Sequence, residues 1–153
     1  DGSTQTISFG QAGDIPLVGR YDGDWISDVA VYRSGAWYIR NSSDGSTTSY
    51  SFGNSTDIPL VGNFDGDSKT DIVVFRPSDG NWYLLLSGSS YGFSSFHWGI
   101  STDIPVPADY NGDGKTDMAV YRNGNWYILT SENYTFLAYY WGLPTDIPLQ
   151  RKQ

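Results

Sequence analysis

The sequence predicts an all-β protein built from a tandem repeat, and composition is the first observation that supports this. The chain has 153 residues, enough for one domain or a set of small repeats. Sixteen of its acidic residues are Asp and only Glu132 is Glu, whereas helical surfaces favour Glu and turns favour Asp. Gly occurs 18 times and aromatic residues make up 16% of the chain, which is typical of short strands joined by tight turns.

The second observation is an internal repeat that runs through the whole chain. Asp-Ile-Pro recurs with steps of 43, 46 and 43 residues, at Asp14, Asp57, Asp103 and Asp146. Three further landmarks keep the same phase: an aromatic-Gly pair (Phe9, Phe52, Trp98 and Trp141), a Trp-Tyr pair (Trp37, Trp82 and Trp126), and an Arg that ends a β-branched run (Arg33, Arg76 and Arg122). Fixed steps across four landmarks favour repeated units over a single sandwich. We expect each Arg to pair with a repeat Asp or with backbone carbonyls.

The third observation is that each unit contains four short alternating segments separated by turn signals. In the second unit these segments are 58–64, 71–76, 81–87 and 93–98. Four strands in 43 to 46 residues match the size of a β-propeller blade. The expected division is a fourth strand of a preceding blade over 1–10, three blades over 11–53, 54–99 and 100–142, and the first strand of a further blade over 143–153.

Three blades do not close a ring, because propellers typically contain four to eight. Open ends leave strand edges that invite association. Two alternatives follow: the chain is a fragment of a longer propeller, or it is a homo-oligomer in which a dimer makes a six-bladed ring.

Three Asp-rich loops in phase with the repeat predict calcium sites. They span 20–28, 63–71 and 109–117 and place oxygen ligands at loop positions 1, 3, 5 and 9, with a backbone carbonyl at position 7. Ca²⁺ takes six to eight such hard ligands, and the alternative is a plain Asp-Gly turn. The expected ligands are Asp109, Asn111, Asp113, the Lys115 carbonyl and Asp117 in the third loop, Asn63, Asp65, Asp67, the Lys69 carbonyl and Asp71 in the second, and Asp22, Asp24 and Asp28 in the first.

The three loops differ at positions 1 and 6. The third is complete and has Gly114 at position 6, where the turn is sharp. The second has Ser68 there, and the first has Trp25 together with Arg20 at position 1. Because a guanidinium cannot ligate a cation and is able to neutralise the carboxylates itself, we expect the affinity to fall from the third loop to the second and then to the first.

These motifs together resemble the FG-GAP/VCBS repeat family, and the resemblance covers essentially the entire chain. It rests on aromatic-Gly, a short gap, Asp-Ile-Pro, and then the loops FDGDSKTD and YNGDGKTD. The resemblance implies a β-propeller with Ca²⁺ in the loop between the first two strands of each blade. It also implies a non-enzymatic module for protein binding, adhesion or scaffolding in a secreted or cell-surface protein.

Two other functions are weighed against this one. Recurrent aromatic side chains suit sugar rings, which gives a multivalent lectin as the alternative, although such residues more often fill a core. The candidate sugar-binding residues are Trp37, Trp82, Trp98, Trp126 and Trp141. An accessory domain of a secreted enzyme is the third possibility. His97 is the single histidine, and nothing in the sequence places a catalytic triad around it.

The composition argues against several classes of binding partner. The formal net charge of −8 argues against nucleic acid and anionic membranes as partners, and the short apolar runs argue against membrane insertion. The chain has no Cys, so disulfides, thiolate metal sites and a cysteine nucleophile are excluded. A protein or a glycan is the expected ligand.

Overall fold

The computed structural model describes residue 4 and residues 6–149, and within them the chain forms three four-stranded antiparallel sheets. The first sheet contains β1 (Ile15–Gly19), β2 (Asp28–Arg33), β3 (Ala36–Arg40) and β4 (Thr47–Ser51). The second contains β5 (Ile58–Leu60), β6 (Ile72–Arg76), β7 (Asn81–Leu86) and β8 (Gly92–His97). The third contains β9 (Ile104–Pro105), β10 (Met118–Arg122), β11 (Asn125–Leu129) and β12 (Phe136–Tyr140). The prediction of an all-β chain with three four-stranded antiparallel repeats is confirmed.

The strands of each sheet follow one another in chain order, and each strand pairs antiparallel with the next. The single helical element in the described residues is a 3₁₀ turn, η1 (Ser87–Ser89). The first strand of the second unit is shorter than expected and ends at Leu60, because the chain turns there into its Asp-rich loop. No helix in the part of the chain described is long and apolar enough to cross a membrane.

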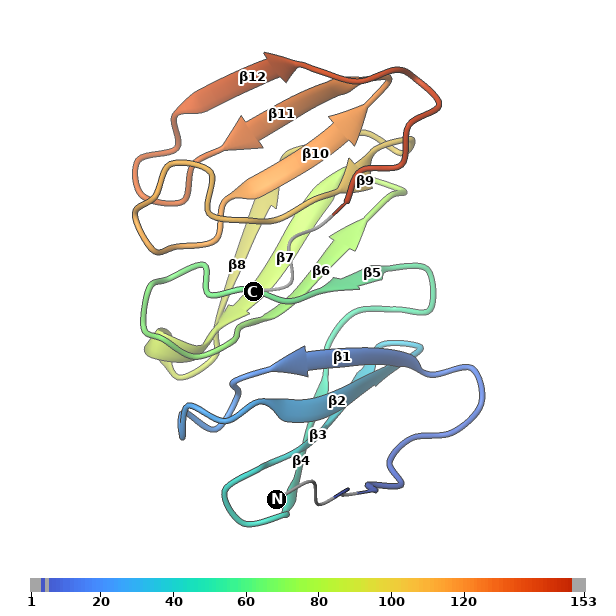
Figure 1. The fold of residues 1–153 in the computed structure, drawn as a ribbon, viewed down its shortest axis with the longest axis vertical. Helices are drawn as coiled ribbons and strands as arrows, with labels where there is room; N and C mark the ends of the chain where they lie inside the picture. Colours follow the sequence, from blue (N-terminus) through green and yellow to red (C-terminus); the bar gives the residue numbers. More distant parts are fainter. Residues whose placement is uncertain (1–3, 5, 150–153) are drawn as a thin grey trace.

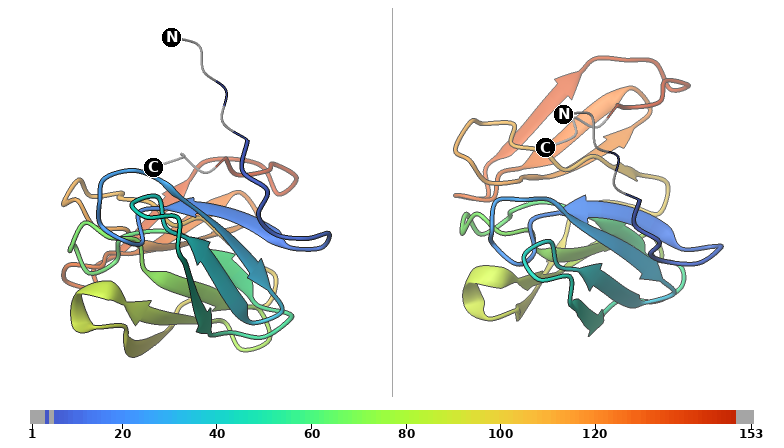
Figure 2. Two further views of the ribbon diagram at one scale, coloured as in Figure 1. Left: turned by 90° about the horizontal axis from the view of Figure 1, so that it is seen from below. Right: turned by 60° about the horizontal axis from the view of Figure 1, so that its bottom comes forward.

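The second sheet lies between the other two (Figures 1 and 2). Strand β6 shows how this arrangement follows from the sequence, since all its residues before Arg76 are apolar. Ile72 and Val74 pack toward the first sheet, whereas Val73 and Phe75 pack toward the third. A strand buried on both faces reads as a continuous apolar run, and β6 is one.

A repeated ion pair fixes the start of each sheet. Arg33, Arg76 and Arg122 each donate two hydrogen bonds to the Asp of an Asp-Ile-Pro segment, with shortest distances of 2.7, 2.8 and 2.6 Å. Each guanidinium also stacks on the Tyr of the Trp-Tyr pair, 4.3 to 4.9 Å from the ring centroid. The three Asp carboxylates are buried. The expected pairing of each Arg with a repeat Asp is confirmed, and it tethers the first strand of each sheet to the second.

The ends of the chain are described only in part. Residues 6–10 and 143–149 form no strand. The rest of the expected end strands, residues 1–3, 5 and 150–153, lies outside the described residues. The division of the chain into three blades with partial ends therefore stays a prediction.

Candidate metal centre

Each Asp-rich loop is anchored by its last Asp, which is buried. Asp28, Asp71 and Asp117 have exposed fractions of 1%, 0% and 0%. One carboxylate oxygen accepts a hydrogen bond from the backbone N–H of the residue at loop position 2, at 2.6 to 2.9 Å. The other accepts the backbone N–H of a serine that follows the third strand of the same sheet, at 2.7 to 2.8 Å. The buried Asp thus ties its loop to the turn beside it.

These serines were not identified from the sequence. They are Ser42, Ser87 and Ser131, and the hydroxyls of the first two also donate to the carboxylate at loop position 5, Asp24 or Asp67. They recur in phase with the repeat, and that spacing was the available signal.

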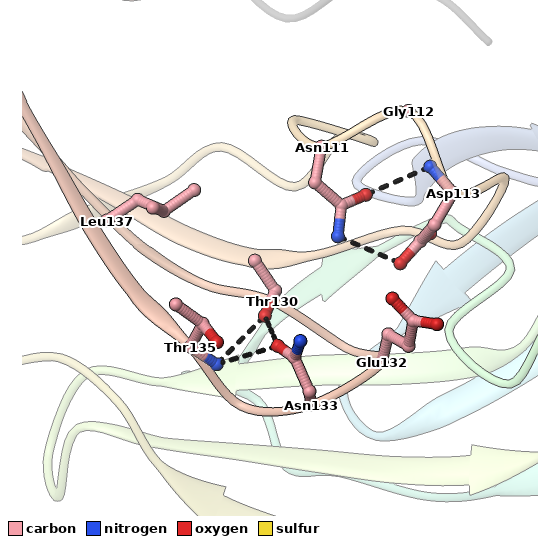
Figure 3. A pocket seen from close by; sticks show the side chains of 8 residues that line it. All are labelled: Asn111, Gly112, Asp113, Thr130, Glu132, Asn133, Thr135 and Leu137. Atoms are coloured by element: carbon pink, nitrogen blue, oxygen red, sulfur yellow. Dashed lines mark hydrogen bonds between the residues drawn. The ribbon is translucent and has the colours of Figure 1, made fainter.

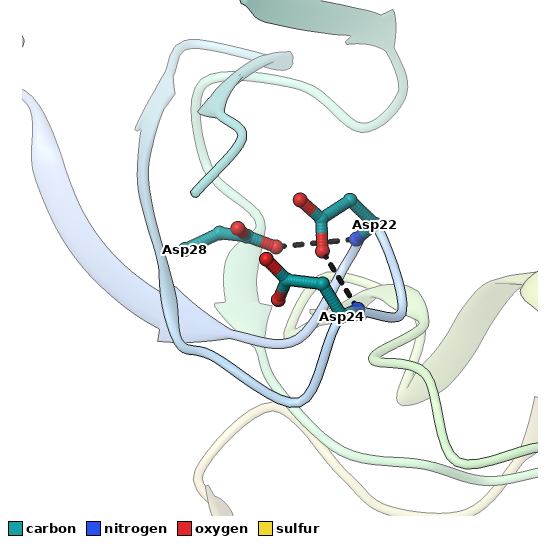
Figure 4. A group of neighbouring side chains, drawn as sticks. All are labelled: Asp22, Asp24 and Asp28. Atoms are coloured by element: carbon teal, nitrogen blue, oxygen red, sulfur yellow. Dashed lines mark hydrogen bonds between the residues drawn. The ribbon is translucent and has the colours of Figure 1, made fainter. Parts of the chain in front are cut away.

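The first loop brings its three carboxylates together (Figure 4). One ligand atom from each of Asp22, Asp24 and Asp28 lies within 4.8 Å of the others. Among the described residues, no other three His, Cys, Asp or Glu side chains meet this criterion. The structure therefore assembles most closely the loop that the sequence ranks last, and the order of affinity stays a prediction.

Arg20 does not enter that cluster as anticipated. Its guanidinium carbon lies 5.3 Å from the centroid of the exposed Trp25 ring. In the described part of the chain it forms no ion pair with the three carboxylates. Stacking on Trp25 holds the positive charge to one side, so position 1 of this loop leaves the acidic cluster open.

Loop position 6 adopts a left-handed backbone in all three loops. The φ angles are 69° at Trp25, 76° at Ser68 and 86° at Gly114. Glycine takes this conformation freely, whereas for a bulky side chain it costs about 1–3 kcal/mol. The sharp turn expected at this position is thus common to the repeat, and the first loop keeps it with a strained Trp.

In the second loop the carboxylates are held by hydrogen bonds. Asp65 accepts the Gly88 N–H at 2.8 Å, and the Asn63 side-chain oxygen accepts the Gly66 N–H at 2.8 Å. Burial raises the pKa of Asp71 to about 6, and the neighbouring Asp65 carboxylate adds to the rise. A nearby positive charge would relieve this crowding of negative charge.

The third loop borders a shallow pocket of about 370 Å³ (Figure 3). Asn111 and Asp113 line it from the loop, and Glu132 and Asn133 line it from the turn between β11 and β12. Burial raises the pKa of the adjoining Asp117, and the Asp113 carboxylate contributes. The sequence did not identify Glu132 as a site residue. Its position in the repeat, after the third strand of the unit, could have indicated that it lies beside the loop.

The remaining ligands expected of this loop are turned toward its own backbone. Asp109 accepts the N–H groups of Gly112 and Gly114 at 2.6 and 3.0 Å, and Asp113 accepts that of Lys115 at 2.7 Å. Lys69 lies at the matching position of the second loop, where its N–H donates to Asp67 at 2.8 Å.

The tryptophans proposed for sugar binding are mostly structural. Trp37 and Trp82 are 0% exposed, and their indole N–H groups donate to the carbonyls of Phe52 and Trp98. The sugar-stacking alternative fails for these two, because neither ring face reaches solvent. Trp98 is half-buried, with its N–H on the Tyr127 carbonyl.

The other two tryptophans lie on the outer face of the third sheet. Trp126 is half-buried and donates to the Trp141 carbonyl, whereas the Trp141 side chain is 78% exposed. The single histidine, His97, is exposed and lies 3.0 Å from the Asn81 side-chain oxygen.

The fold and the loops define a class of protein: an all-β tandem repeat with one Asp-rich loop per unit. The family model described as FG-GAP-like repeat matches residues 63–120, from the second loop into β10. Residues 63–120 are therefore similar to an FG-GAP-like repeat, which confirms the resemblance to the FG-GAP/VCBS repeat family over that part of the chain. Neither the curated proteins nor the solved structures contain a match to the chain.

Proposed function

We propose that the three sheets are β-propeller blades and that the chain is a non-enzymatic, calcium-binding repeat module. Its Asp-rich loops bind Ca²⁺, and the metal stabilises the fold of a secreted or cell-surface protein that presents this module to a protein ligand. The observation that carries the proposal is the loop anchor repeated three times, because it holds a set of acidic oxygens in the same place in each unit.

The donor set of the first loop fits Ca²⁺. Two oxygens on one Ca²⁺, each at ~2.3–2.6 Å from the ion, lie no more than about 5 Å apart. One carboxylate oxygen from each of Asp22, Asp24 and Asp28 meets this limit, since these three atoms lie within 4.8 Å of one another. Hard oxygen donors without His or Cys favour Ca²⁺ over zinc or copper.

The same chemistry extends to the other loops. Asp65, Asp67 and Asp71 would hold the ion in the second loop, and Asp113 and Asp117 in the third. A bound divalent cation would supply positive charge to carboxylates that otherwise repel one another. An ion that binds only the folded chain stabilises it by mass action.

A protein is the ligand we favour over a glycan. The recurrent Trp37 and Trp82 are buried, so the blades lack the repeated aromatic platforms that a multivalent lectin would need.

Thermal unfolding in Ca²⁺ and in excess chelator tests this proposal. At a Ca²⁺ concentration about 100 times Kd, stabilisation is about 2.7 kcal/mol, which raises the Tm of a chain of this size by about 5–10 °C. We expect Asp24→Asn to reduce the rise, because it removes one charge from the cluster in the first loop. Asp44→Asn, in an exposed turn outside the loops, is the matched control and should leave the rise intact. An identical Tm with Ca²⁺, Mg²⁺ or chelator would contradict the proposal.

A further inference from the structure

We propose that the outer face of the third sheet docks onto the first sheet of a second copy of this chain. The contact is head to tail and repeats the contact that successive sheets make twice within one chain. This inference rests on the blade arrangement proposed above and not on calcium binding.

Within the chain, successive loops are joined by one threonine. The Thr70 N–H donates to the Arg20 carbonyl at 2.9 Å, and the Arg20 N–H donates to the Thr70 hydroxyl at 2.8 Å. Thr116 and Asn63 repeat both bonds, at 2.7 and 3.0 Å. Each threonine therefore makes two hydrogen bonds across the boundary between two sheets.

The repeat leaves one such donor–acceptor set unused at each end of the stack. Ser27 takes the position of Thr70 and Thr116 in the first loop, and Asp109 takes the position of Arg20 and Asn63 in the third. Within the described residues, neither the Ser27 side chain nor the Asp109 main chain has a hydrogen-bond partner. Ser27 is exposed, whereas Thr116 is buried. A second copy would supply Ser27 to Asp109.

The internal contacts are close enough to demand glycine opposite threonine. A Cβ placed on Gly19 would lie 2.7 Å from the Thr70 hydroxyl oxygen and 2.8 Å from its methyl carbon. One placed on Gly62 would lie 2.7 Å from both the methyl carbon and the hydroxyl oxygen of Thr116. Real Cβ atoms do not approach so closely, so an alanine at either glycine would collide with both the hydroxyl and the methyl group of the threonine it faces.

The two unused positions differ from the internal pairs in a complementary way. The third unit has Ala108 where the others have glycine, and the first unit has Ser27 where the others have threonine. Serine lacks one of the two threonine atoms with which the added Cβ would collide, the methyl carbon. These two residues meet only if the third unit of one copy packs against the first unit of another. This match in size is why we assign the face to a second copy and not to an unrelated partner.

Loop positions 4 and 7 also support docking of the third unit onto the first unit of a second copy. A Cβ on Gly23 would lie 2.7 Å from Lys69 Cε, and one on Gly66 would lie 2.9 Å from Lys115 Cε, so each lysine stem covers the preceding loop. Gly112 has no atom within 4 Å of the same point. The residue equivalent to the lysines in the first loop is Ile26, which is 61% exposed. Docking would place Ile26 over Gly112 and bury both.

The aromatic side chains of the last strand in each sheet also contact the next sheet. The internal ring pairs are Tyr50–Tyr91, Phe52–Phe93, Phe96–Tyr134 and Trp98–Phe136, with centroids 4.7 to 6.4 Å apart. Tyr139 and Trp141 take the corresponding positions in the third unit and are 52% and 78% exposed. They form the aromatic part of the outer face.

The receiving face of the first sheet is smaller and more polar than its equivalents. Arg40 pairs across the hairpin with Thr47, where the other sheets pair Leu85 with Phe93 and Leu129 with Phe136. A guanidinium at this place suits the face of a tyrosine ring, so Arg40 would receive Tyr139 by a cation–π contact.

One segment has to move for the copies to dock. A Cβ on Gly10 would lie 3.0 Å from a Val31 methyl carbon, much as one on Gly53 would lie 3.3 Å from Val74. Residues 6–10 thus occupy the place that Trp141–Gly142 of the second copy would take. We expect residues 6–10 to give way, since they form no strand, whereas β1 is held to β2 over five residue pairs.

Sedimentation of the full chain, with and without Ca²⁺, tests the contact. We expect a species of two chains, twice the 17.0-kDa chain mass. Ser27→Thr adds the methyl group that faces Ala108 and should weaken association by about tenfold. Ala108→Gly combined with Ser27→Thr recreates the pair found inside the chain and should restore association.

The control is Thr70→Ser, which makes a threonine-to-serine exchange at an internal boundary and should leave association unchanged. A chain that stays monomeric at all concentrations would overturn the inference. So would an assembly that is indifferent to Ser27→Thr. Because these variants alter no proposed metal ligand, a failure here is distinguishable from a failure to bind Ca²⁺.

Discussion

Replacing Asp28 with alanine is expected to lower the free energy of unfolding by about 2–5 kcal/mol in chelator, where no metal contributes. The Asp28 carboxylate is buried and accepts backbone N–H groups from Tyr21 at 2.7 Å, Asp22 at 3.2 Å and Ser42 at 2.7 Å. Alanine leaves these donors without a partner, and an unsatisfied buried donor costs about 1–3 kcal/mol. Urea denaturation followed by circular dichroism measures the loss.

The matched control for this change is Asp44→Ala. Asp44 lies in the exposed turn between β3 and β4 and accepts one N–H, from Ser46. Its removal should cost no more than about 1 kcal/mol. If both variants lose the same stability, the buried Asp is not the anchor of its loop.

Replacing Trp82 with alanine is expected to cost about 3–5 kcal/mol. The side chain is 0% exposed and packs against Phe64 and Phe75, with ring centroids 6.2 and 5.8 Å away. Its indole N–H also donates to the Trp98 carbonyl at 2.7 Å. Alanine would leave a cavity between the second and third sheets and an unpaired carbonyl.

Trp25→Ala is the comparison for Trp82→Ala in the same urea experiment. Trp25 is exposed and its backbone is strained, so its loss should change stability by less than about 1 kcal/mol. If the two variants lose the same free energy of unfolding, Trp82 does not fill a core between the sheets. That result would favour the sugar-binding alternative.

Repeat spacing predicts the architecture well because each unit solves the same packing problem. The continuous apolar run from Ile72 to Phe75 predicts a strand that is buried on both faces. Arg76, which follows it, forms an ion pair with the buried carboxylate of Asp57. The apolar run is visible in the local pattern, and the pairing of Arg76 with Asp57 lies within one unit. The shared left-handed turn at loop position 6 is fixed in the same way.

The arrangement of the site was harder to predict because it depends on side-chain contacts that the repeat spacing does not specify. Arg20 occupies a ligand position in the sequence, but the ring of Trp25 draws its guanidinium aside. Ser42 lies 14 residues from Asp28 and meets it only because β2 and β3 pair. The burial of Trp37 depends on the second sheet, whereas no sheet among the described residues packs over Trp141, which is exposed.

Calorimetric titration of the full chain with Ca²⁺, after removal of metal by chelator, tests the central claim most directly. The account predicts saturable binding that is weakened by Asp24→Asn and unchanged by Asp44→Asn, with little response to Mg²⁺. The absence of binding heat, together with a Tm indifferent to Ca²⁺, would contradict it and leave the Asp-rich loops as turns held by their own hydrogen bonds.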